Sequence, residues 1–332
     1  MVDDTRPLRF GILGAARIAP AALLAPALRH PEAEVVAVAA RDRTRGERFA
    51  RRHGIARVHD DYPALLADPE VDAVYIPLPN GLHGRWTRAA LAAGKHVLCE
   101  KPFTADAAEA REIAAAATGS GLVVMEAFHY RYHPLVAAAE EVIAAGELGP
   151  LRHVEASICF PLPRFSDIRY DYGLAGGALM DAGCYAVHMA RVFGGEEPEV
   201  VSARAKLRDP KVDRAMLADL RFPSGHTGRV RCSMWSVDLL RVAVTVVGAK
   251  GRMRIVNPLL PHQGHLLSVR TDTRRFRRRF TRRTSYDFQL DAFTDAVLRG
   301  APVPTGPDDS VATMSVVDAV YAAAGLPPRV PA

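Results

Sequence analysis

The sequence predicts an α/β protein with two domains: a doubly wound parallel sheet first, then an α+β domain with a large open, mostly antiparallel sheet. At 332 residues the chain exceeds the roughly 250 to 300 residues at which a single core usually divides. Up to residue 126, short β-rich runs alternate with alanine-rich helical stretches, which is typical of parallel βαβ units. Beyond it the β-branched runs lengthen and helices become sparse, as in antiparallel sheets. We therefore predict domains at residues 1–126 and 127–332.

The spacing of apolar residues predicts the individual elements. In the first domain, strands are expected at Leu8 to Leu13, Glu34 to Ala40, Ala73 to Ile76, His96 to Cys99 and Leu122 to Met125. In the second, they are expected at Arg152 to Phe160, Glu199 to Leu207, Met216 to Phe222, Gly228 to Ser233 and Leu240 to Val247. Helices are expected at Leu135 to Ala145, Gly177 to Phe193, Tyr286 to Leu298 and Ser310 to Ala324.

The positive charge of the chain is local. The net charge is +6, yet the arginine strip, Arg274 to Arg283, alone holds seven arginines. The rest is close to neutral, which argues against general binding to nucleic acid or membranes. The strip itself could meet nucleotide-sugar phosphates, an acidic partner or nucleic acid, or could be a solvated sheet edge whose charges discourage strand pairing.

Cysteine usage and the N-terminus predict a cytoplasmic protein. The four cysteines are widely separated and form no CxxC, which argues against disulfides and structural zinc. His129 and His133 lie four apart without an HExxH pattern, so we expect no metal site. The N-terminus has no basic start and no long apolar stretch, so we expect neither an export signal nor a membrane partner.

The stretch GILGAARIA predicts a phosphate-binding turn between the first strand and a helix. Its candidate residues are Gly11, Gly14, Ala15, Ala16, Arg17 and Ile18. Backbone N–H groups at such a turn, together with a helix N-terminus, suit a pyrophosphate. Read as G-x-G-x-x-G, the motif has alanine at its second and third glycine positions, so an ordinary strand-to-helix turn remains the alternative.

The end of the second predicted strand, VVAVAARDR, favours NADP over NAD. An acid at this position usually binds the ribose 2′-hydroxyl of NAD, whereas arginine suits the 2′-phosphate of NADP. Ala40 occupies the acid position, Arg41 follows, and the nearest acid is Asp42. The alternative is that Arg41 is a solvated residue at a helix start.

The tripeptide Glu100-Lys101-Pro102 directly follows another apolar strand. A lysine just past a strand end can point into a cleft, and the proline restricts the lysine backbone to extended geometry. Farther along, Asp181, Tyr185 and His188 have i, i+4 and i+7 spacing, so a helix would present all three on one face.

Five stretches resemble the Gfo/Idh/MocA oxidoreductase family in order and spacing over essentially the whole chain. They are GILGAARIA, YIPLPNGLHGRW, LCEKPFT, EAFHYRYHP and GGALMDAGCYAVH. The resemblance is closest to dimeric dihydrodiol dehydrogenases, D-xylose dehydrogenases and deoxysugar ketoreductases. It implies a dinucleotide-binding Rossmann domain and a substrate-binding and oligomerisation domain, in a homodimer or homotetramer. The implied reaction is hydride transfer between nicotinamide and a secondary alcohol, ketone or hemiacetal carbon of a sugar or polyol.

The resemblance also implies roles for single residues. Lys101 matches the family lysine beside the reacting carbonyl, and its bond to Pro102 is often cis in the family. Glu100 would contact the cofactor or orient the lysine. The loop with Pro77, Asn80 and His83 would pass the nicotinamide ribose, although Asn-Gly is also a common turn and His83 could simply open a helix.

For the chemistry, we hypothesise that Tyr185 donates or accepts the proton while Lys101 stabilises the oxyanion. The lysine cation would also favour the phenolate of Tyr185, and Asp181 would orient Lys101. His188 is the rival acid, or else a histidine bonded to backbone. Arg169 and Tyr170 would shape the substrate end of the site.

Two other functions are consistent with the same motifs. One is the NAD-dependent glycoside hydrolysis found in the family, against which Tyr185 and Arg41 speak. The other is a non-catalytic regulator that senses the cofactor and contacts nucleic acid through the arginine strip. In that case Lys101 and Tyr185 would be dispensable.

Overall fold

The computed structural model describes residues 6–332 and divides them into two compact units. The first unit runs to His129 and also includes Tyr286–Val311, and the second comprises Tyr130–Ser285 and Ala312–Ala332. The prediction assigned residues 286–311 to the second domain, whereas the structure groups them with the first. The reason is a helix in this segment whose apolar side chains pack on the first sheet. The binding roles assigned to the two domains remain predictions.

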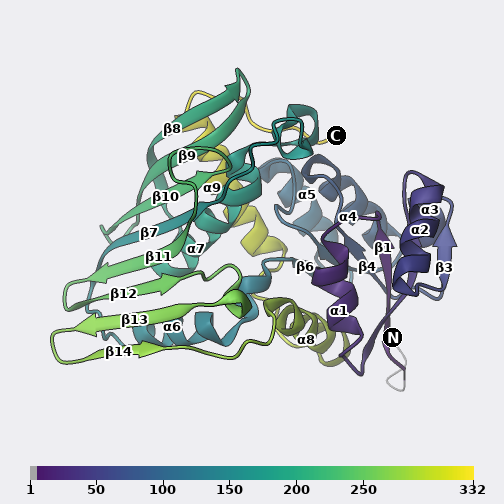
Figure 1. The fold of residues 1–332 in the computed structure, drawn as a ribbon, viewed down its shortest axis with the longest axis horizontal. Coiled ribbons are helices and arrows are strands. Elements are labelled where there is room, and N and C mark those ends of the chain that lie inside the picture. The colour runs from purple at the N-terminus through teal and green to yellow at the C-terminus, as the bar shows by residue number, and fades with distance from the viewer. Residues whose placement is uncertain (1–5) are drawn as a thin grey trace. The chain divides into compact units, whose positions relative to one another are not determined.

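The first unit contains a six-stranded sheet with the strand order β3-β2-β1-β4-β5-β6 (Figure 1). The strands are β1 (Leu8–Leu13), β2 (Ala33–Ala39), β3 (Arg57–His59), β4 (Ala73–Ile76), β5 (His96–Cys99) and β6 (Val124–Glu126). All neighbours are parallel. This is the doubly wound order, which confirms the predicted fold class.

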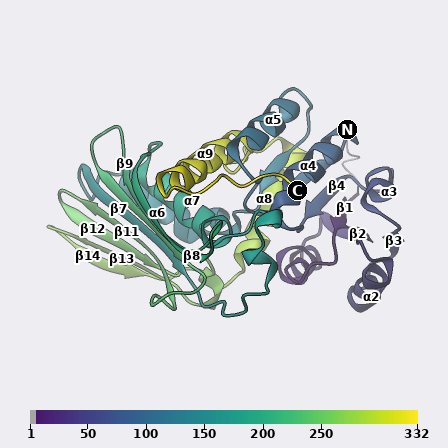
Figure 2. The same ribbon diagram turned by 90° about the horizontal axis from the view of Figure 1, so that it is seen from above.

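Helices cover both faces of this sheet. They are η1 (Pro20–Leu24), α1 (Ala25–Ala27), α2 (Arg43–His53), α3 (Tyr62–Leu66), η2 (Asn80–Leu82), α4 (His83–Ala92), α5 (Ala107–Ala117) and α8 (Ser285–Arg299). Helices α4 and α5 lie on one face, and α1 and α2 on the other (Figure 2). On α8, the fully buried ring of Phe293 lies 5.5 Å from that of Phe10 in β1, so α8 completes the core of this unit.

The second unit contains an eight-stranded sheet with the order β14-β13-β12-β11-β7-β10-β9-β8. Its strands are β7 (Leu151–Cys159), β8 (Glu199–Asp209), β9 (Val212–Arg221), β10 (Thr227–Ser233), β11 (Arg241–Gly248), β12 (Gly251–Val256), β13 (Leu266–Thr271) and β14 (Arg275–Arg278). Only the pair β7 and β10 is parallel; the other pairs are antiparallel. The predicted open, mostly antiparallel sheet is confirmed.

Helices pack on one face of the eight-stranded sheet. They include α6 (Pro134–Ala144), the π-helical turn η6 (Leu179–Gly183) continued by α7 (Cys184–Gly194), and α9 (Pro307–Ala323), whose later part belongs to this unit. Figure 2 shows α6 and α7 on the same side of the strands. Short 3₁₀ turns η3 (His129–Tyr132), η4 (Ile168–Tyr170), η5 (Tyr172–Leu174) and η7 (Pro261–Gln263) connect the elements.

The arginine strip forms a sheet edge, as one of its predicted alternatives stated. Its only strand, β14, is the last in the sheet order and pairs with β13 alone. The strand ends at Arg278. Arg274 binds Glu147 through its Nε at 3.1 Å, and its guanidinium lies 4.8 Å from the ring centroid of Phe276.

The four cysteines are all buried as free thiols. Burial raises the pKa of Cys159 to about 11. Between residues 6 and 332, no helix is both long and apolar enough to cross a membrane.

Candidate cofactor and catalytic sites

Gly14 forms the turn that follows β1. Its φ is +109°, a conformation that residues with side chains rarely adopt. Its N–H donates to the carbonyl of Ala39 at the end of β2 (2.7 Å). A Cβ on Gly14 would also lie 3.0 Å from Cδ2 of Leu78. The turn therefore requires glycine for both its backbone angle and its space.

The residues after Gly14 lead into a helical segment. Ala15 is buried, whereas Arg17 and Ile18 are exposed. The Ala16 N–H donates back to the Gly14 carbonyl (2.8 Å). A helix N-terminus immediately follows, in the place where phosphates bind in this strand-turn-helix arrangement.

Gly11, the other predicted turn residue, lies inside β1. A Cβ there would be 2.6 Å from Cδ2 of Leu65 on α3, so Gly11 allows α3 to approach the sheet closely. The structure thus gives this glycine a packing role, two residues before the strand ends at Leu13.

The residues after β2 form a cationic corner. Asp42 caps α2, where its carboxylate accepts the N–H of Arg45 (3.2 Å). Arg45 in turn donates from Nη2 to the carbonyl of Ala15 (2.8 Å). Arg41 is exposed, and its backbone binds the hydroxyl of Tyr62, a residue whose pKa is raised by burial. Asp42 is thus engaged as the cap of α2, while two arginines lie close to the glycine turn.

Arg45 was missed in the sequence, because its place in the first turn of α2, three residues after the Asp42 cap, depends on where the helix begins. The contact of Arg45 with Ala15 brings the end of β2 and the glycine turn together.

The loop after β4 is fixed to the segment that carries Lys101. Pro77 is buried and Asn80 opens η2. The His83 ring is fully buried, with its two nitrogens 2.7 Å from the carbonyl oxygens of Leu78 and Pro102. Burial lowers the pKa of His83 to about 4. His83 therefore links two loops through its ring, and its predicted contact with the ribose stays a prediction.

The segment Glu100 to Phe103 is held at both ends. The hydroxyl of Tyr75 donates to Oε1 of Glu100 (2.7 Å), and the N–H of Phe103 donates to Oε1 of the fully buried Glu126 (2.9 Å). Lys101 between them is half-buried. Its peptide bond to Pro102 is cis, as the family resemblance implied.

In the second unit, Asp181 lies in the π-helical turn η6 and pairs with Arg169. The Arg169 Nε is 3.2 Å from Oδ1 of Asp181, and the Asp181 carboxylate raises the pKa of Arg169. π-Helical turns are frequent at functional sites. The orientation of Lys101 by Asp181 stays a prediction, and the partner that the structure shows for Asp181 is an arginine from the loop that precedes the helix.

Tyr185 and His188 follow on α7 and differ in accessibility. The Tyr185 side chain is 6% exposed and His188 is 0% exposed. The Tyr130 ring packs edge-on against both, and its hydroxyl is hydrogen-bonded to Nδ1 of His188. His188 is therefore a core histidine in this unit. The role of His188 as the rival acid or as a substrate contact stays a prediction.

The Tyr170 hydroxyl is also engaged in a hydrogen bond within the protein. Its hydroxyl donates to the carbonyl of Leu162 (2.9 Å), and burial raises its pKa to about 12. Arg169 is the more accessible member of this predicted substrate pair, with its side chain 43% exposed.

Comparison with known families decides the class of the protein. Residues 8–128 match the model of an oxidoreductase family with an NAD-binding Rossmann fold, and residues 136–254 match the GFO/IDH/MocA C-terminal domain. The chain belongs to the Gfo/Idh/MocA oxidoreductase family. Members of this family named below are similar to the chain over nearly all of its length.

Among curated relatives, D-xylose 1-dehydrogenase (NADP(+)) 2 of Haloferax volcanii is 40% identical over 96% of this chain and 97% of its own. The dTDP-3,4-didehydro-2,6-dideoxy-alpha-D-glucose 3-reductase of Actinomadura kijaniata is 34% identical over 96% of both. The solved structure of KijD10, a 3-ketoreductase from Actinomadura kijaniata in complex with NADP and TDP-benzene, superposes with a TM-score of 0.87. The two sequences are 32% identical, and the match covers 96% of this chain and 98% of the KijD10 chain.

Proposed function

We propose that the protein is an NADP-dependent oxidoreductase that transfers a hydride between nicotinamide and a secondary alcohol, ketone or hemiacetal carbon of a sugar or related polyol. The observation that carries the cofactor assignment is the capping role of Asp42, beside Arg41 and Arg45. The substrate class rests on the xylose dehydrogenase and ketoreductase relatives.

The residues of the first unit fit this cofactor. Gly14 to Ile18 would hold the pyrophosphate at the turn and helix N-terminus. Arg41 and Arg45 would bind the 2′-phosphate through charge-assisted hydrogen bonds. Pro77, Asn80 and Glu100 would contact the nicotinamide ribose. When bound, the cofactor supplies or accepts the hydride.

Proton transfer is assigned to Tyr185. As hydride reaches the carbonyl carbon of a ketone, the phenol donates its proton to the carbonyl oxygen, and the reverse reaction returns that proton to the phenolate. The Lys101 ammonium stabilises negative charge on the same oxygen. Asp181 orients the cationic groups of the site, including Arg169, with which it pairs. The exposed N–H groups of Arg169 would bind hydroxyls of the substrate.

A second copy of the chain would form a homodimer or homotetramer. The β11 side chains Ala243, Thr245 and Val247 alternate with the buried Val244 and Val246 and point away from the helices. In the described chain, no element packs on that face in Figure 2, and another subunit would cover it.

The first test measures turnover. The wild-type protein is expected to form NADPH from NADP⁺ with aldoses or dihydrodiols, or to oxidise NADPH with ketosugars, and to prefer NADP over NAD. Tyr185→Phe is expected to lower kcat by about 10² to 10⁴ with an unchanged affinity for NADPH, measured by fluorescence titration as the control for folding. Turnover of Tyr185→Phe within a factor of two of wild type would contradict its role. Release of a glycoside leaving group without net change in NADPH would instead support the hydrolase alternative.

A further inference from the structure

Arg329, in the tail after α9, is fully buried. An arginine without partners is strongly disfavoured in a protein interior, so its partners indicate its role. Its Nη2 donates to Oδ1 of Asp213 (2.9 Å) and its Nε donates to the carbonyl of Gly176 (2.6 Å). Its guanidinium also lies 4.1 Å from the ring centroid of Tyr321, a favourable cation–π distance. The tail is therefore anchored inside the second unit.

Asp213, on β9, connects this anchor to the helix that carries the proposed acid. The carboxylate is fully buried. Its Oδ1 also accepts the hydroxyl of Tyr321 (3.0 Å), and its Oδ2 accepts the N–H of Leu179 (2.7 Å), the first residue of η6. Both carboxylate oxygens are thus used, one toward the tail and one toward the start of the π-helical turn.

Gly177 lies between these groups and the loop that carries Arg169. Its φ is +136°, and a Cβ there would be 2.3 Å from Oδ1 of Asp213 and 2.8 Å from Nη2 of Arg329. Its N–H donates to the carbonyl of Arg169 (2.8 Å), and its own carbonyl accepts the N–H of Asp181 (3.0 Å). Arg329 thus contacts the neighbouring glycines Gly176 and Gly177. Through the backbone of Gly177, these glycines are hydrogen-bonded to both members of the Arg169–Asp181 ion pair.

We propose that Arg329 is a positioning residue for the reaction. By fixing Gly176 and Gly177, it holds Arg169 and Asp181 in register at the start of the helix that carries Tyr185. Arginine suits this role because its planar fork bonds a carboxylate and a carbonyl at the same time, which a lysine ammonium does less well. This inference rests on the proposed function of that helix.

The experiment compares Arg329→Gln and Arg329→Lys with a matched control, Arg191→Gln. Arg191 is also buried in the second unit, and it binds Glu197 (2.6 Å) and Thr313 (2.5 Å). We measure kcat, KM, the Kd for NADPH and the melting temperature of each. Both glutamine variants are expected to melt at lower temperature, but only Arg329→Gln should lower kcat by about tenfold or more, with the Kd for NADPH within about twofold of wild type.

The conservative variant separates positioning from stability. Arg329→Lys keeps a cation beside Asp213 and should recover most of the melting temperature, yet its kcat should stay at least about fivefold low because the Gly176 bond is lost. Recovery of kcat together with melting temperature, or equal losses of kcat in the Arg191 control, would overturn the proposal. If Arg329→Gln does not fold, the double variant Asp213→Asn/Arg329→Gln removes both buried charges and takes its place, with the same expected loss of kcat.

Hydrogen exchange distinguishes failure of this inference from failure of the proposed function. The amides of Gly177 and Asp181 should exchange faster in Arg329→Lys than in wild type, whatever the substrate is. Unchanged exchange would overturn the positioning role. Faster exchange in a protein that turns over no sugar would keep the structural link and refute the reaction assigned to the helix.

Discussion

The proposed preference for NADP depends on one hydrogen bond of the Asp42 carboxylate. Had it faced the ribose, it could have accepted a hydrogen bond from the 2′-hydroxyl of NAD. Its bond to the Arg45 N–H instead caps α2, an interaction typically worth about 1 kcal/mol. In the proposed cofactor site, Arg41 and Arg45 would then be the groups that bind the 2′-phosphate.

We predict that Arg41→Ala and Arg45→Ala each raise the Kd for NADPH by about tenfold or more, because a hydrogen bond to a charged group contributes about 1.5 to 3 kcal/mol. The Kd for NADH should change by no more than about threefold, since NADH lacks the 2′-phosphate. Fluorescence titrations at fixed salt measure both constants.

The matched control is Arg43→Ala. Arg43 lies on α2 with Arg45, but its side chain pairs with Glu47 and Asp60. This variant should leave both affinities near wild type. Equal weakening of NADPH and NADH in the Arg41 or Arg45 variants would refute their role as 2′-phosphate ligands.

Single residues were predictable from sequence where local backbone geometry demanded them. Gly14 is an example, because its turn requires a positive φ. His83 and His188 were harder, because a histidine on a helix has the same spacing whether it faces a ligand or the core. The Arg169–Asp181 pair depends on a loop folding back onto a helix, which no local pattern specifies.

At the scale of elements, strands with apolar alternation were predicted within a few residues of their bounds. Three strands were missed, and each has a physical reason. β3 is only three residues long, while β12 alternates arginine with apolar residues as GRMRIV and resembles an exposed loop in composition. β13, LLSVRT, follows the irregular segment around η7. The predicted single helix from Gly177 to Phe193 begins as a π-helical turn, a distinction that amphipathic spacing does not reveal.

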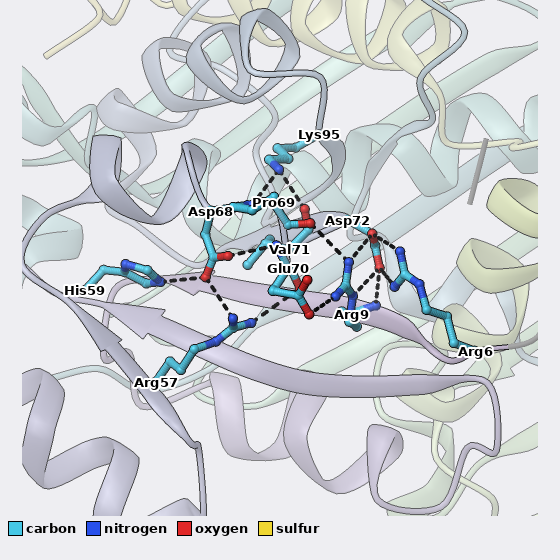
Figure 3. A network of polar contacts seen from close by, with 10 residues as sticks. All are labelled: Arg6, Arg9, Arg57, His59, Asp68, Pro69, Glu70, Val71, Asp72 and Lys95. Atoms are coloured by element: carbon cyan, nitrogen blue, oxygen red, sulfur yellow. Dashed lines mark hydrogen bonds and ion pairs between the residues drawn. The ribbon is translucent and has the colours of Figure 1, made fainter. Parts of the chain in front are cut away.

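A polar network fixes the loop between α3 and β4, at the edge of the parallel sheet where β1 and β4 begin (Figure 3). Asp72 accepts hydrogen bonds from Arg6 (2.7 Å) and from the backbone N–H of Arg9 (3.0 Å). Lys95 donates to the carbonyls of Asp68 (2.8 Å) and Val71 (2.7 Å). Gly14 lies at the opposite ends of the strands, so we assign this network to stability.

The network predicts a pH-dependent stability. Burial alone would raise the pKa of Asp72, but hydrogen bonds from Arg6 and Arg9 outweigh it and hold this pKa well below its usual range. A carboxyl group with a lowered pKa in the folded state stabilises the fold above its unfolded pKa of about 3.9, and this contribution is lost as the pH falls below that value. The free energy of unfolding should therefore begin to fall near about pH 5 and continue to fall through pH 3, until the pH reaches the lowered pKa of the folded state.

We predict that Asp72→Asn lowers the free energy of unfolding at neutral pH by about 1 to 3 kcal/mol and flattens its decline in acid. Urea denaturation over this pH range measures both effects. Glu70→Gln is the control, because the Glu70 side chain is 59% exposed and contributes little. Parallel pH curves for wild type and Asp72→Asn would contradict this assignment.

At the scale of the whole molecule, the first unit is built from two separate parts of the chain. Helix α8 contributes Phe293 against Phe10, and Arg29 on the first part binds Asp287 on α8. Strand-helix alternation predicts the Rossmann sheet from local spacing. It cannot predict that a helix near the C-terminus returns to that sheet, because this contact joins residues that are far apart in sequence.

We predict that a fragment of residues 1–129 is aggregation-prone and lacks a cooperative melting transition, because the apolar surface beneath α8 is exposed. Linking residues 1–129 to 286–311 through a short Gly/Ser linker should restore cooperative melting and NADPH binding. A short linker suffices because the rings of His129 and Tyr286 lie 4.1 Å apart. Calorimetry and fluorescence titration test both fragments, and a fragment 1–129 that binds NADPH like the full chain would refute this prediction.

The same discontinuity affects how the protein emerges from the ribosome. The strand that carries Phe10 is made early, but its cover, Phe293, follows only after the entire sheet of the second unit has been translated. At roughly 5 to 20 residues per second, this delay is on the order of fifteen to sixty seconds. During that interval the nascent chain presents an uncovered apolar face, so its yield in cells should depend on the chaperones that bind such surfaces during translation.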